Sequence, residues 1–170
     1  MKIYIDFDGV ILDTDSTLEK EYSKVNNIDK KEFVKNYDWN LLLNNSDVIA
    51  DSLENIKKSK YDISLLSKIS SMQEGAAKVK YLRKNNVNIN IHLVPAELSK
   101  NEVVNAKDNI LIDDKVYNLE KWEQSGGIPI FFNMHNQDID IYNKKNTKYK
   151  KINNLQILLT DELKKILDKQ

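Results

Sequence analysis

Two aspartates one residue apart follow the first apolar stretch of the chain, and they are well suited to chemistry. Residues 2–5 are Lys-Ile-Tyr-Ile, which predicts a short buried strand. Asp6 and Asp8 come directly after it, and Gly9 predicts a turn that lets the backbone approach a ligand closely. Carboxylates at the end of a buried strand are unfavourable unless they bind a cation or react. The alternative is a strand that simply ends in solvated aspartates, because aspartate is common in turns.

The elements around these acids predict an α/β fold. Apolar runs that alternate with helical patterns indicate a Rossmann-like, five-stranded parallel sheet with helices on both faces. The five predicted strands, with a further short strand near the end of the chain, are at residues 2–5, 61–66, 87–94, 109–112, 128–132 and 149–152.

Ligands bind outside the carboxyl ends of the strands in such sheets. Six polar residues follow the predicted strands: Asp6, Asp8, Ser67, Lys100, Asp113 and Asp114. We therefore expect four acids, a hydroxyl group and an ammonium group to converge on one edge of the sheet.

A helical segment separates the first two strands. Residues 16–60 contain neither Gly nor Pro, and their patterns predict helices at 17–25, at about 29–37, and after Ser46 as an N-cap. This connection is longer than a simple crossover helix requires. We interpret residues 14–60 as a small helical cap, and residues 1–13 and 61–170 as the core domain. Further helices are predicted at 76–84 (after a Ser71–Glu74 capping box), 98–104, 116–124 and 161–167.

The converging set predicts phosphoryl transfer. Four carboxylates close together cannot all ionise without a cation. Carboxylate oxygens are hard ligands, which favours Mg²⁺ as the cofactor. A lysine and a serine beside the ion are suitable donors to phosphate, and aspartate can act as a nucleophile towards phosphorus.

Composition excludes several other functions. The chain has 26 basic and 26 acidic residues, so its zero net charge does not favour nucleic acid or an anionic membrane as a partner. It has no cysteine, which excludes disulfides and thiolate chemistry, and only two histidines, which does not favour a zinc site. No signal peptide or membrane span is expected. The expectation is a cytoplasmic protein that is a monomer or a homodimer.

The motifs resemble those of the haloacid dehalogenase (HAD) superfamily of phosphatases. The resemblance rests on Asp-Phe-Asp-Gly-Val at 6–10, a later strand that ends in Ser67, then Lys100, and Ile-Leu-Ile-Asp-Asp at 110–114, in that order. It covers about residues 1–132. Response-regulator receiver domains use a similar set of residues, but in a different order along the chain.

The resemblance implies a role for each residue. Asp6 would be the nucleophile that forms an aspartyl-phosphate, and Asp8 the general acid and then the general base. Ser67 and Lys100 would bind the phosphoryl group. The Asp6 carboxylate, the Asp8 carbonyl group, Asp113 and Asp114 would hold Mg²⁺. Lys107 is a rival to Lys100 for the lysine role.

Within the superfamily, the helical insertion and Gly-Gly-Ile-Pro-Ile-Phe-Phe-Asn at 126–133 resemble the 5'-nucleotidase group, which includes the 5'(3')-deoxyribonucleotidases. That resemblance implies a Mg²⁺-dependent phosphomonoesterase, most simply for a nucleoside monophosphate. Phe33, Tyr37 and Trp39 are candidates for stacking on a base, and helix packing is their alternative role.

Other functions remain open at this point. A sugar phosphatase would use the same residues. Lysines at 144, 145, 148, 150 and 151, beside Tyr142 and Tyr149, could contact nucleic acid and would favour a polynucleotide-end phosphatase. Two further alternatives are a phosphotransferase and a non-catalytic binding protein with the same fold.

Overall fold

A parallel sheet forms the centre of the molecule. The computed structural model of the protein describes residues 1–134 and 148–167. Within these residues, six strands pair in the order β3-β2-β1-β4-β5-β6, all parallel. The strands are β1 (Ile3–Ile5), β2 (Ile63–Ile69), β3 (Asn90–Pro95), β4 (Ile110–Asp113), β5 (Ile128–Phe132) and β6 (Lys150–Ile152). The predicted α/β fold is confirmed, and β6 occupies the place of the short strand expected at 149–152.

From β1 the chain adds β2 and β3 on one side of the sheet and then β4, β5 and β6 on the other side. The ends of β1 and β4 therefore lie at the topological switch point of the sheet. β1 pairs with β2 on one side and with β4 on the other, and Ile5 lies opposite both Leu65 and Ile112. All three residues of β1 are buried, as expected for a central strand covered on both faces. The crevice outside the carboxyl ends of β1 and β4 is where such folds bind ligands.

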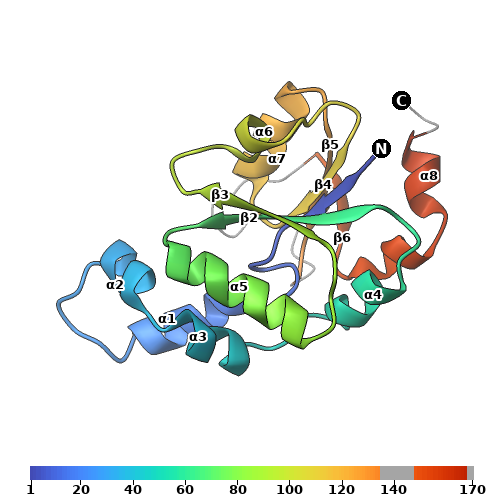
Figure 1. Cartoon of the computed structure of the whole chain (residues 1–170). Helices are drawn as coiled ribbons and strands as arrows, with labels where there is room; N and C mark the ends of the chain where they lie inside the picture. The colour runs from blue at the N-terminus through green and yellow to red at the C-terminus, as the bar shows by residue number, and fades with distance from the viewer. Residues whose placement is uncertain (135–147, 168–170) are drawn as a thin grey trace.

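Helices cover both faces of this sheet (Figure 1). They are α1 (Thr14–Tyr22), α2 (Lys30–Asn36), α3 (Trp39–Asn45), α4 (Ser52–Lys58), α5 (Met72–Lys84), α6 (Lys100–Val103), α7 (Val116–Gln124), the 3-10 helix η1 (Leu155–Leu159) and α8 (Glu162–Leu167). In the described part of the chain, every helix is too short or too polar to cross a membrane.

Alternation along the strands divides the core between the two faces. Ile3 and Ile5 pack towards α5 and the 3-10 helix, in the larger hydrophobic cluster. Tyr4 packs on the other face with residues of α7, and its ring lies edge-on to Trp122 at a centroid distance of 5.4 Å. The core therefore consists of two apolar layers separated by the sheet.

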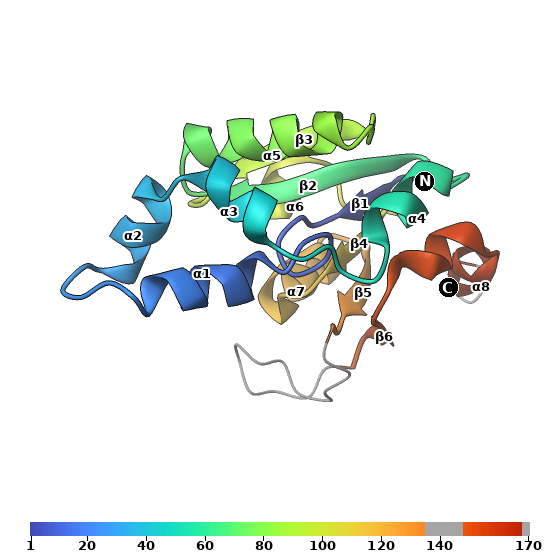
Figure 2. The same ribbon diagram turned by 90° about the horizontal axis from the view of Figure 1, so that it is seen from below.

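The inserted helices differ in how closely they join this core. Residues 47–49 return to the start of the chain, where the Ile49 N–H donates to the Ile11 carbonyl group and Val48 forms a bridge with Leu12. α3 lies along α5, and Trp39 and Leu42 are part of the larger cluster. α1 and α2 instead extend beyond the sheet (Figure 2). That residues 14–60 act as a cap stays a prediction.

Several expected boundaries are wrong, because α1 begins at Thr14 instead of residue 17 and α5 begins at Met72 instead of residue 76. β2 runs to Ile69 instead of ending at Leu66, because its pairing with β3 continues to Ile69 opposite Pro95, so Ser67 lies inside the strand. β3 begins at Asn90 instead of residue 87 and ends at Pro95, where an edge strand can lack one N–H donor. Ser46 does not begin a helix: its hydroxyl donates to the Leu42 carbonyl group and ends α3.

Candidate active site

Asp6 is held at the carboxyl end of β1 by the neighbouring strand. Its backbone N–H donates to the Ile112 carbonyl group of β4, at 3.0 Å. Its side chain is buried, and Oδ1 accepts a hydrogen bond from the Phe7 N–H at 2.8 Å. The Lys100 ammonium group lies 3.0 Å from the same oxygen. The carboxylate is thus fixed, with its Oδ1 directed towards these donors.

Asp113 and Asp114 extend this site from the end of β4. One oxygen from each of Asp6, Asp113 and Asp114 lies within 4.8 Å of the others. The Asn118 amide donates to both oxygens of Asp113, at 3.1 and 3.0 Å, and Lys100 donates to Oδ2 at 2.6 Å. The structure therefore gathers three of the four predicted acids into one cluster of oxygens.

Gly9 makes room for the third acid of the cluster. Its φ of +71° lies in the left-handed region that glycine favours. A Cβ atom on Gly9 would lie 2.4 Å from Asp114 Oδ2. Asp114 Oδ1 is buried and has no hydrogen-bond partner among the residues that the structure describes. The turn after Asp8 is therefore shaped around the Asp114 carboxylate.

Two carboxylates of this cluster, those of Asp6 and Asp114, resist ionisation. Burial raises the pKa of Asp6 to about 6; the Lys100 charge opposes the rise, and Asp113 and Asp8 add to it. Burial likewise raises the pKa of Asp114 well above its ordinary value, with Lys115 opposing. A cation among these oxygens would favour their charged forms.

Asp8 points to a different set of partners. Its Oδ1 accepts from the Thr14 hydroxyl at 2.7 Å, and its Oδ2 from the Lys78 ammonium group at 2.5 Å. Its carboxylate is absent from the oxygen cluster of the three other aspartates. Asp6 and Asp8 are thus held by different lysines, which come from opposite faces of the sheet.

Sequence reasoning missed Lys78. This lysine on α5 is fully buried, and its ammonium group also donates to Glu74 Oε1 at 2.6 Å, the Ser67 hydroxyl at 3.1 Å and the Lys68 carbonyl group at 3.1 Å. The nearby acids keep the pKa of Lys78 above its ordinary value, although burial opposes them. A weak signal was present, because Glu74, Lys78 and Leu82 follow one another at a spacing of four, on one helix face.

The two lysines that competed for the site lie far apart in the fold. Lys100 is buried between Asp6 and Asp113. Lys107 is exposed in the turn before β4, at the amino edge of the sheet. Ser67 is fully buried, and its hydroxyl accepts from Lys78. The structure thus brings Lys100 into the cluster and leaves Lys107 outside it.

A cleft of about 320 Å³ opens above these groups. Asp6, Asp8 and Asn118 line it from the core, and α1 and α2 contribute Leu18 and Lys30. Ser67 is absent from this lining, whereas its neighbour in β2, Lys68, is part of it.

The aromatic candidates of the inserted helices mostly pack on each other. Phe33 contacts Tyr22 and Tyr37, with ring centroids 5.3 and 5.0 Å apart. Trp39 lines the cleft but is buried, and its indole N–H donates to the Val34 carbonyl group. These contacts favour helix packing as the role of Phe33 and Tyr37.

The predicted basic run is described only in part. Lys144, Lys145 and Tyr142 lie outside the described residues. Lys148 and Lys150 form ion pairs with Glu123 and Glu162.

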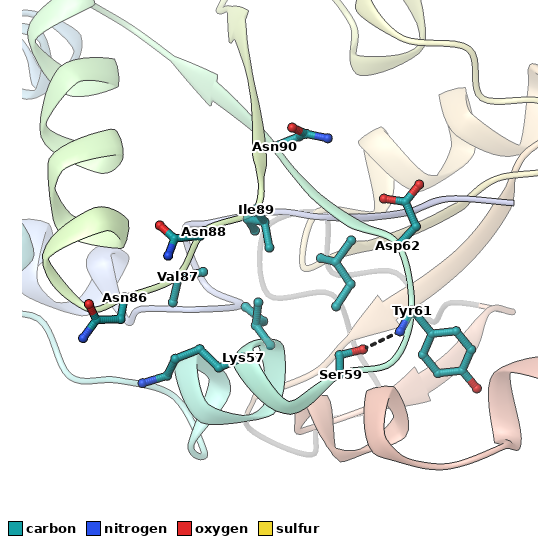
Figure 3. A pocket seen from close by; sticks show the side chains of 11 residues that line it. Lys57, Ser59, Tyr61, Asp62, Asn86, Val87, Asn88, Ile89 and Asn90 are labelled. Carbon is teal, nitrogen blue, oxygen red and sulfur yellow. Dashed lines mark hydrogen bonds between the residues drawn. The ribbon is translucent and has the colours of Figure 1, made fainter.

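A second, larger cavity of about 490 Å³ lies at the opposite, amino edge of the sheet, between α4 and the loop before β3 (Figure 3). Several of its polar groups bond within the protein: the Ser59 hydroxyl donates to the Leu158 carbonyl group and accepts from the Tyr61 N–H. The acid cluster does not line this cavity. The smaller cleft is therefore the candidate reaction site.

Solved structures with a similar fold include haloacid dehalogenase-like hydrolases and a sugar phosphatase. A haloacid dehalogenase-like family hydrolase from Xanthomonas campestris superposes with a TM-score of 0.63 at 13% identity, over 100% of this chain and 92% of that one. The HAD-hydrolase YfnB from Bacillus subtilis, bound to magnesium, gives 0.60 at 11% identity, over 98% of both chains. D,D-heptose 1,7-bisphosphate phosphatase from Burkholderia thailandensis gives 0.57 at 14% identity, over 95% and 97%.

Comparison of the sequence itself finds no matching family model and no matching curated protein. At these identities the structural likeness establishes the fold: the chain has the HAD-like fold.

Proposed function

We propose that the protein is a phosphomonoester hydrolase that forms a phosphoryl-aspartate at Asp6. The observation that carries this proposal is the position of the Asp6 carboxylate. It is buried at the end of β1, 3.0 Å from the Lys100 ammonium group, in the oxygen cluster with Asp113 and Asp114. Asp8 lies two residues away and lines the same cleft. Nucleophile, charge stabilisation and proton carrier are therefore available together.

The residues at this site fit a divalent cation. The partnerless buried oxygen of Asp114, the raised pKa values and the all-oxygen donor set suit a hard ion such as Mg²⁺. Asp6, Asp113 and Asp114 would hold it, and the Asp8 carbonyl group is a further candidate ligand. When bound, the ion would offset the negative charge of the phosphate oxygens.

The chain's own residues can carry both halves of the reaction. An Asp6 oxygen attacks phosphorus, the bond from phosphorus to the leaving oxygen breaks, and Asp8 gives that oxygen a proton. A water molecule then gives its proton to Asp8 and attacks the phosphoryl-aspartate, which releases inorganic phosphate and restores Asp6. Lys100 balances charge at Asp6 throughout. The expected role of Ser67 as a phosphoryl donor stays a prediction.

For the substrate, we favour a nucleoside monophosphate. The cleft of about 320 Å³ is at the small end of ligand pockets, which supports one small phosphomonoester over a polynucleotide end. Residues 14–60 would act as the cap, since α1 and α2 supply Leu18, Glu19, Lys30 and Val34 to the cleft. A sugar phosphate is the second candidate, and the phosphatase neighbour named for a heptose bisphosphate favours it.

Phosphate release from a panel of monoesters tests the proposal. The panel contains 5'- and 3'-nucleotides, sugar phosphates and phenyl phosphate, each with Mg²⁺ and with EDTA. We expect turnover that needs Mg²⁺ and falls by at least about a thousandfold in Asp6→Asn, because the nucleophile is lost. Lys107→Gln, at the far edge of the sheet, is the matched control and should retain activity. No turnover on any substrate would favour a non-catalytic binding protein.

A further inference from the structure

Lys68 is a lysine of the cleft that forms no ion pair in the described part of the chain, although its charge helps to lower the pKa of the exposed Glu102. It lies on β2 opposite Val94 of β3, and Leu66, two residues earlier, packs in the cluster on the α7 face. Because side chains alternate along a strand, Lys68 lies on that face and Ser67 on the α5 face. Lys68 is only half-buried, and it lines the cleft together with Ile69 and Ala96.

The other lysines of the site all have carboxylate partners. These ion pairs are Lys30 with Glu19, Lys78 with Asp8 and Glu74, Lys100 with Asp6 and Asp113, and Lys115 with Asp15 and Asp114. Among residues 1–134 and 148–167, Lys68 makes no ion pair; its ammonium group donates only to the Ala96 carbonyl group, at 3.3 Å.

This arrangement suits an anion that is not part of the protein. An ammonium group has three N–H donors, and the long bond to Ala96 occupies one of them. The other two N–H groups of Lys68 can bind a ligand, and this half-buried side chain lines the same cleft as Asp6 and Asp8. Lysine binds phosphate as a point charge, and charge-assisted hydrogen bonds are among the strongest available to a ligand.

The neighbouring serine is already occupied. The Ser67 hydroxyl accepts from Lys78 and is directed towards the Lys68 carbonyl group, and Ser67 does not line the cleft. Of the two β2 side chains that line the cleft, those of Lys68 and Ile69, only that of Lys68 is charged and can bind an anion.

We propose that Lys68 is a phosphate-binding residue of the cleft. This inference rests on the proposed phosphatase function and adds a substrate-binding residue to it. The phosphate could be the one transferred to Asp6, or a second phosphate on the leaving group. Both have the same chemistry, so the experiment includes substrates that distinguish them.

Calorimetric titration with inorganic phosphate, in the presence of Mg²⁺, tests the inference on the full chain. Lys68→Gln should weaken phosphate binding about tenfold or more, the usual scale for a lost charge-assisted hydrogen bond. Lys68→Arg keeps the charge and should recover part of the affinity. Lys84→Gln removes an exposed lysine at the end of α5, outside this cleft, and should bind phosphate as the wild type does. Thermal unfolding should be the same for all four proteins, because Lys68 makes a single weak bond.

Steady-state kinetics locates the phosphate that Lys68 binds. Phenyl phosphate, a nucleoside 5'-monophosphate and a nucleoside 3',5'-bisphosphate are compared in the wild type and Lys68→Gln. A similar rise in KM for all three supports contact with the transferred group, and a rise confined to the bisphosphate supports a second phosphate.

The two proposals fail in different ways. If the wild type hydrolyses monoesters and binds phosphate, but Lys68→Gln does so equally well, the role of Lys68 is wrong and the phosphatase function stands. If the wild type neither binds phosphate nor hydrolyses any monoester, both are wrong.

Discussion

At the scale of single residues, the site combines acids that destabilise the fold with groups that hold them in place. Asp6 and Asp114 have raised pKa values because they are buried. Lys100 and Asn118 fix the oxygens of Asp113, and Lys100 also balances Asp6. Such strain is common at reaction sites, where charge needed for chemistry opposes stability.

We predict that Asp6→Asn stabilises the metal-free protein while it abolishes activity. The folded pKa of Asp6 is about 6, above the ordinary 3.8. A raised carboxyl pKa favours the folded state while the group is protonated, and this contribution is lost as pH rises from about 4 through 6. At neutral pH the difference corresponds to up to about 3 kcal/mol of destabilisation, part of which Asn would recover while losing the Lys100 ion pair.

Urea unfolding in EDTA between pH 4 and pH 8 measures this effect. The stability advantage of Asp6→Asn over the wild type should grow from pH 4 to about pH 6 and then level off. Mg²⁺ should raise the stability of the wild type and have little effect on the variant. An advantage that does not change with pH would contradict the prediction.

Two glycines with positive φ allow a matched test of the Gly9 turn. Gly9→Ala adds backbone strain and a Cβ atom 2.4 Å from Asp114 Oδ2. Gly126→Ala adds similar strain, but its Cβ would meet only Lys107, at 3.6 Å. We expect Gly126→Ala to lower the free energy of unfolding by about 1–2 kcal/mol and to leave the Mg²⁺ affinity unchanged.

Gly9→Ala should lower the free energy of unfolding more than Gly126→Ala does. It should also weaken Mg²⁺ binding about tenfold or more, because Asp114 must move. Thermal unfolding and calorimetry with Mg²⁺ measure the two effects. Equal Mg²⁺ affinity in both variants would show that the Gly9 turn does not position Asp114.

At the scale of elements, the site draws on both layers of helices. β1 delivers Asp6 and Asp8, and β4 delivers Asp113. α6 and α7, on one face, supply Lys100 and Asn118 around Asp6 and Asp113, whereas α5, on the other face, supplies Lys78 to Asp8. The position of α5 against the sheet therefore determines the geometry of Asp8.

Replacing Lys78 tests this role of α5. Lys78→Met leaves Asp8 and Glu74 without their buried cation, so we expect a loss of about 3–5 kcal/mol of stability and a lower kcat. Lys80→Met changes an exposed lysine on the same helix and should leave both nearly unchanged.

A double variant keeps this test informative if Lys78→Met folds poorly. Adding Glu74→Gln removes one of the two uncompensated charges and should restore part of the stability but not the kcat, because Asp8 still lacks its partner. Full activity in the double variant would refute the positioning role of Lys78.

The helix boundaries show which local sequence signals are enough to predict where a helix begins or ends. Val116–Gln124 ends as expected before Gly126, and Asp29 caps α2 by accepting from the N–H groups of Lys31 and Glu32. The prediction of a helix after Ser46 was wrong because a serine can end a helix as well as begin one. The Ser46 hydroxyl donates to the carbonyl group of Leu42, four residues earlier. The local sequence therefore indicates that a helix begins or ends near such a residue. Which of the two occurs depends on the tertiary structure.

At the scale of the whole molecule, one apolar cluster joins the inserted helices to the core. It contains Trp39 and Leu42 of α3, Ile5 of β1, and Leu158 of the 3-10 helix. This continuity predicts that residues 14–60 unfold together with the sheet, even though α1 and α2 extend beyond it.

The two tryptophans offer a direct test. Trp39 lies in α3 and Trp122 in α7, and both are buried. In Trp122→Phe the fluorescence reports on the inserted helices, and in Trp39→Phe on the core. Each variant's fluorescence transition in urea should coincide with its own far-UV circular dichroism transition. An earlier fluorescence transition in Trp122→Phe would show that the inserted helices unfold independently.

The sequence by itself determined the fold class and the convergence of the acids. Parallel strands alternate with helices, so the carboxyl ends of β1 and β4 must meet at one edge, and Asp6, Asp113 and Asp114 follow those ends. The order of these motifs along the chain was enough to indicate the HAD-like fold, without any knowledge of distances.

Only the tertiary structure decided how these acids are held. Lys78 reaches Asp8 from 70 residues away in the chain, and no local pattern encodes a contact that depends on how a helix packs on a sheet. The same packing occupies Ser67 and leaves Lys68 facing the cleft, although the two are neighbours in sequence. Partners of charged side chains come from segments that only the folded chain brings together, and these partners determine what each charge can do.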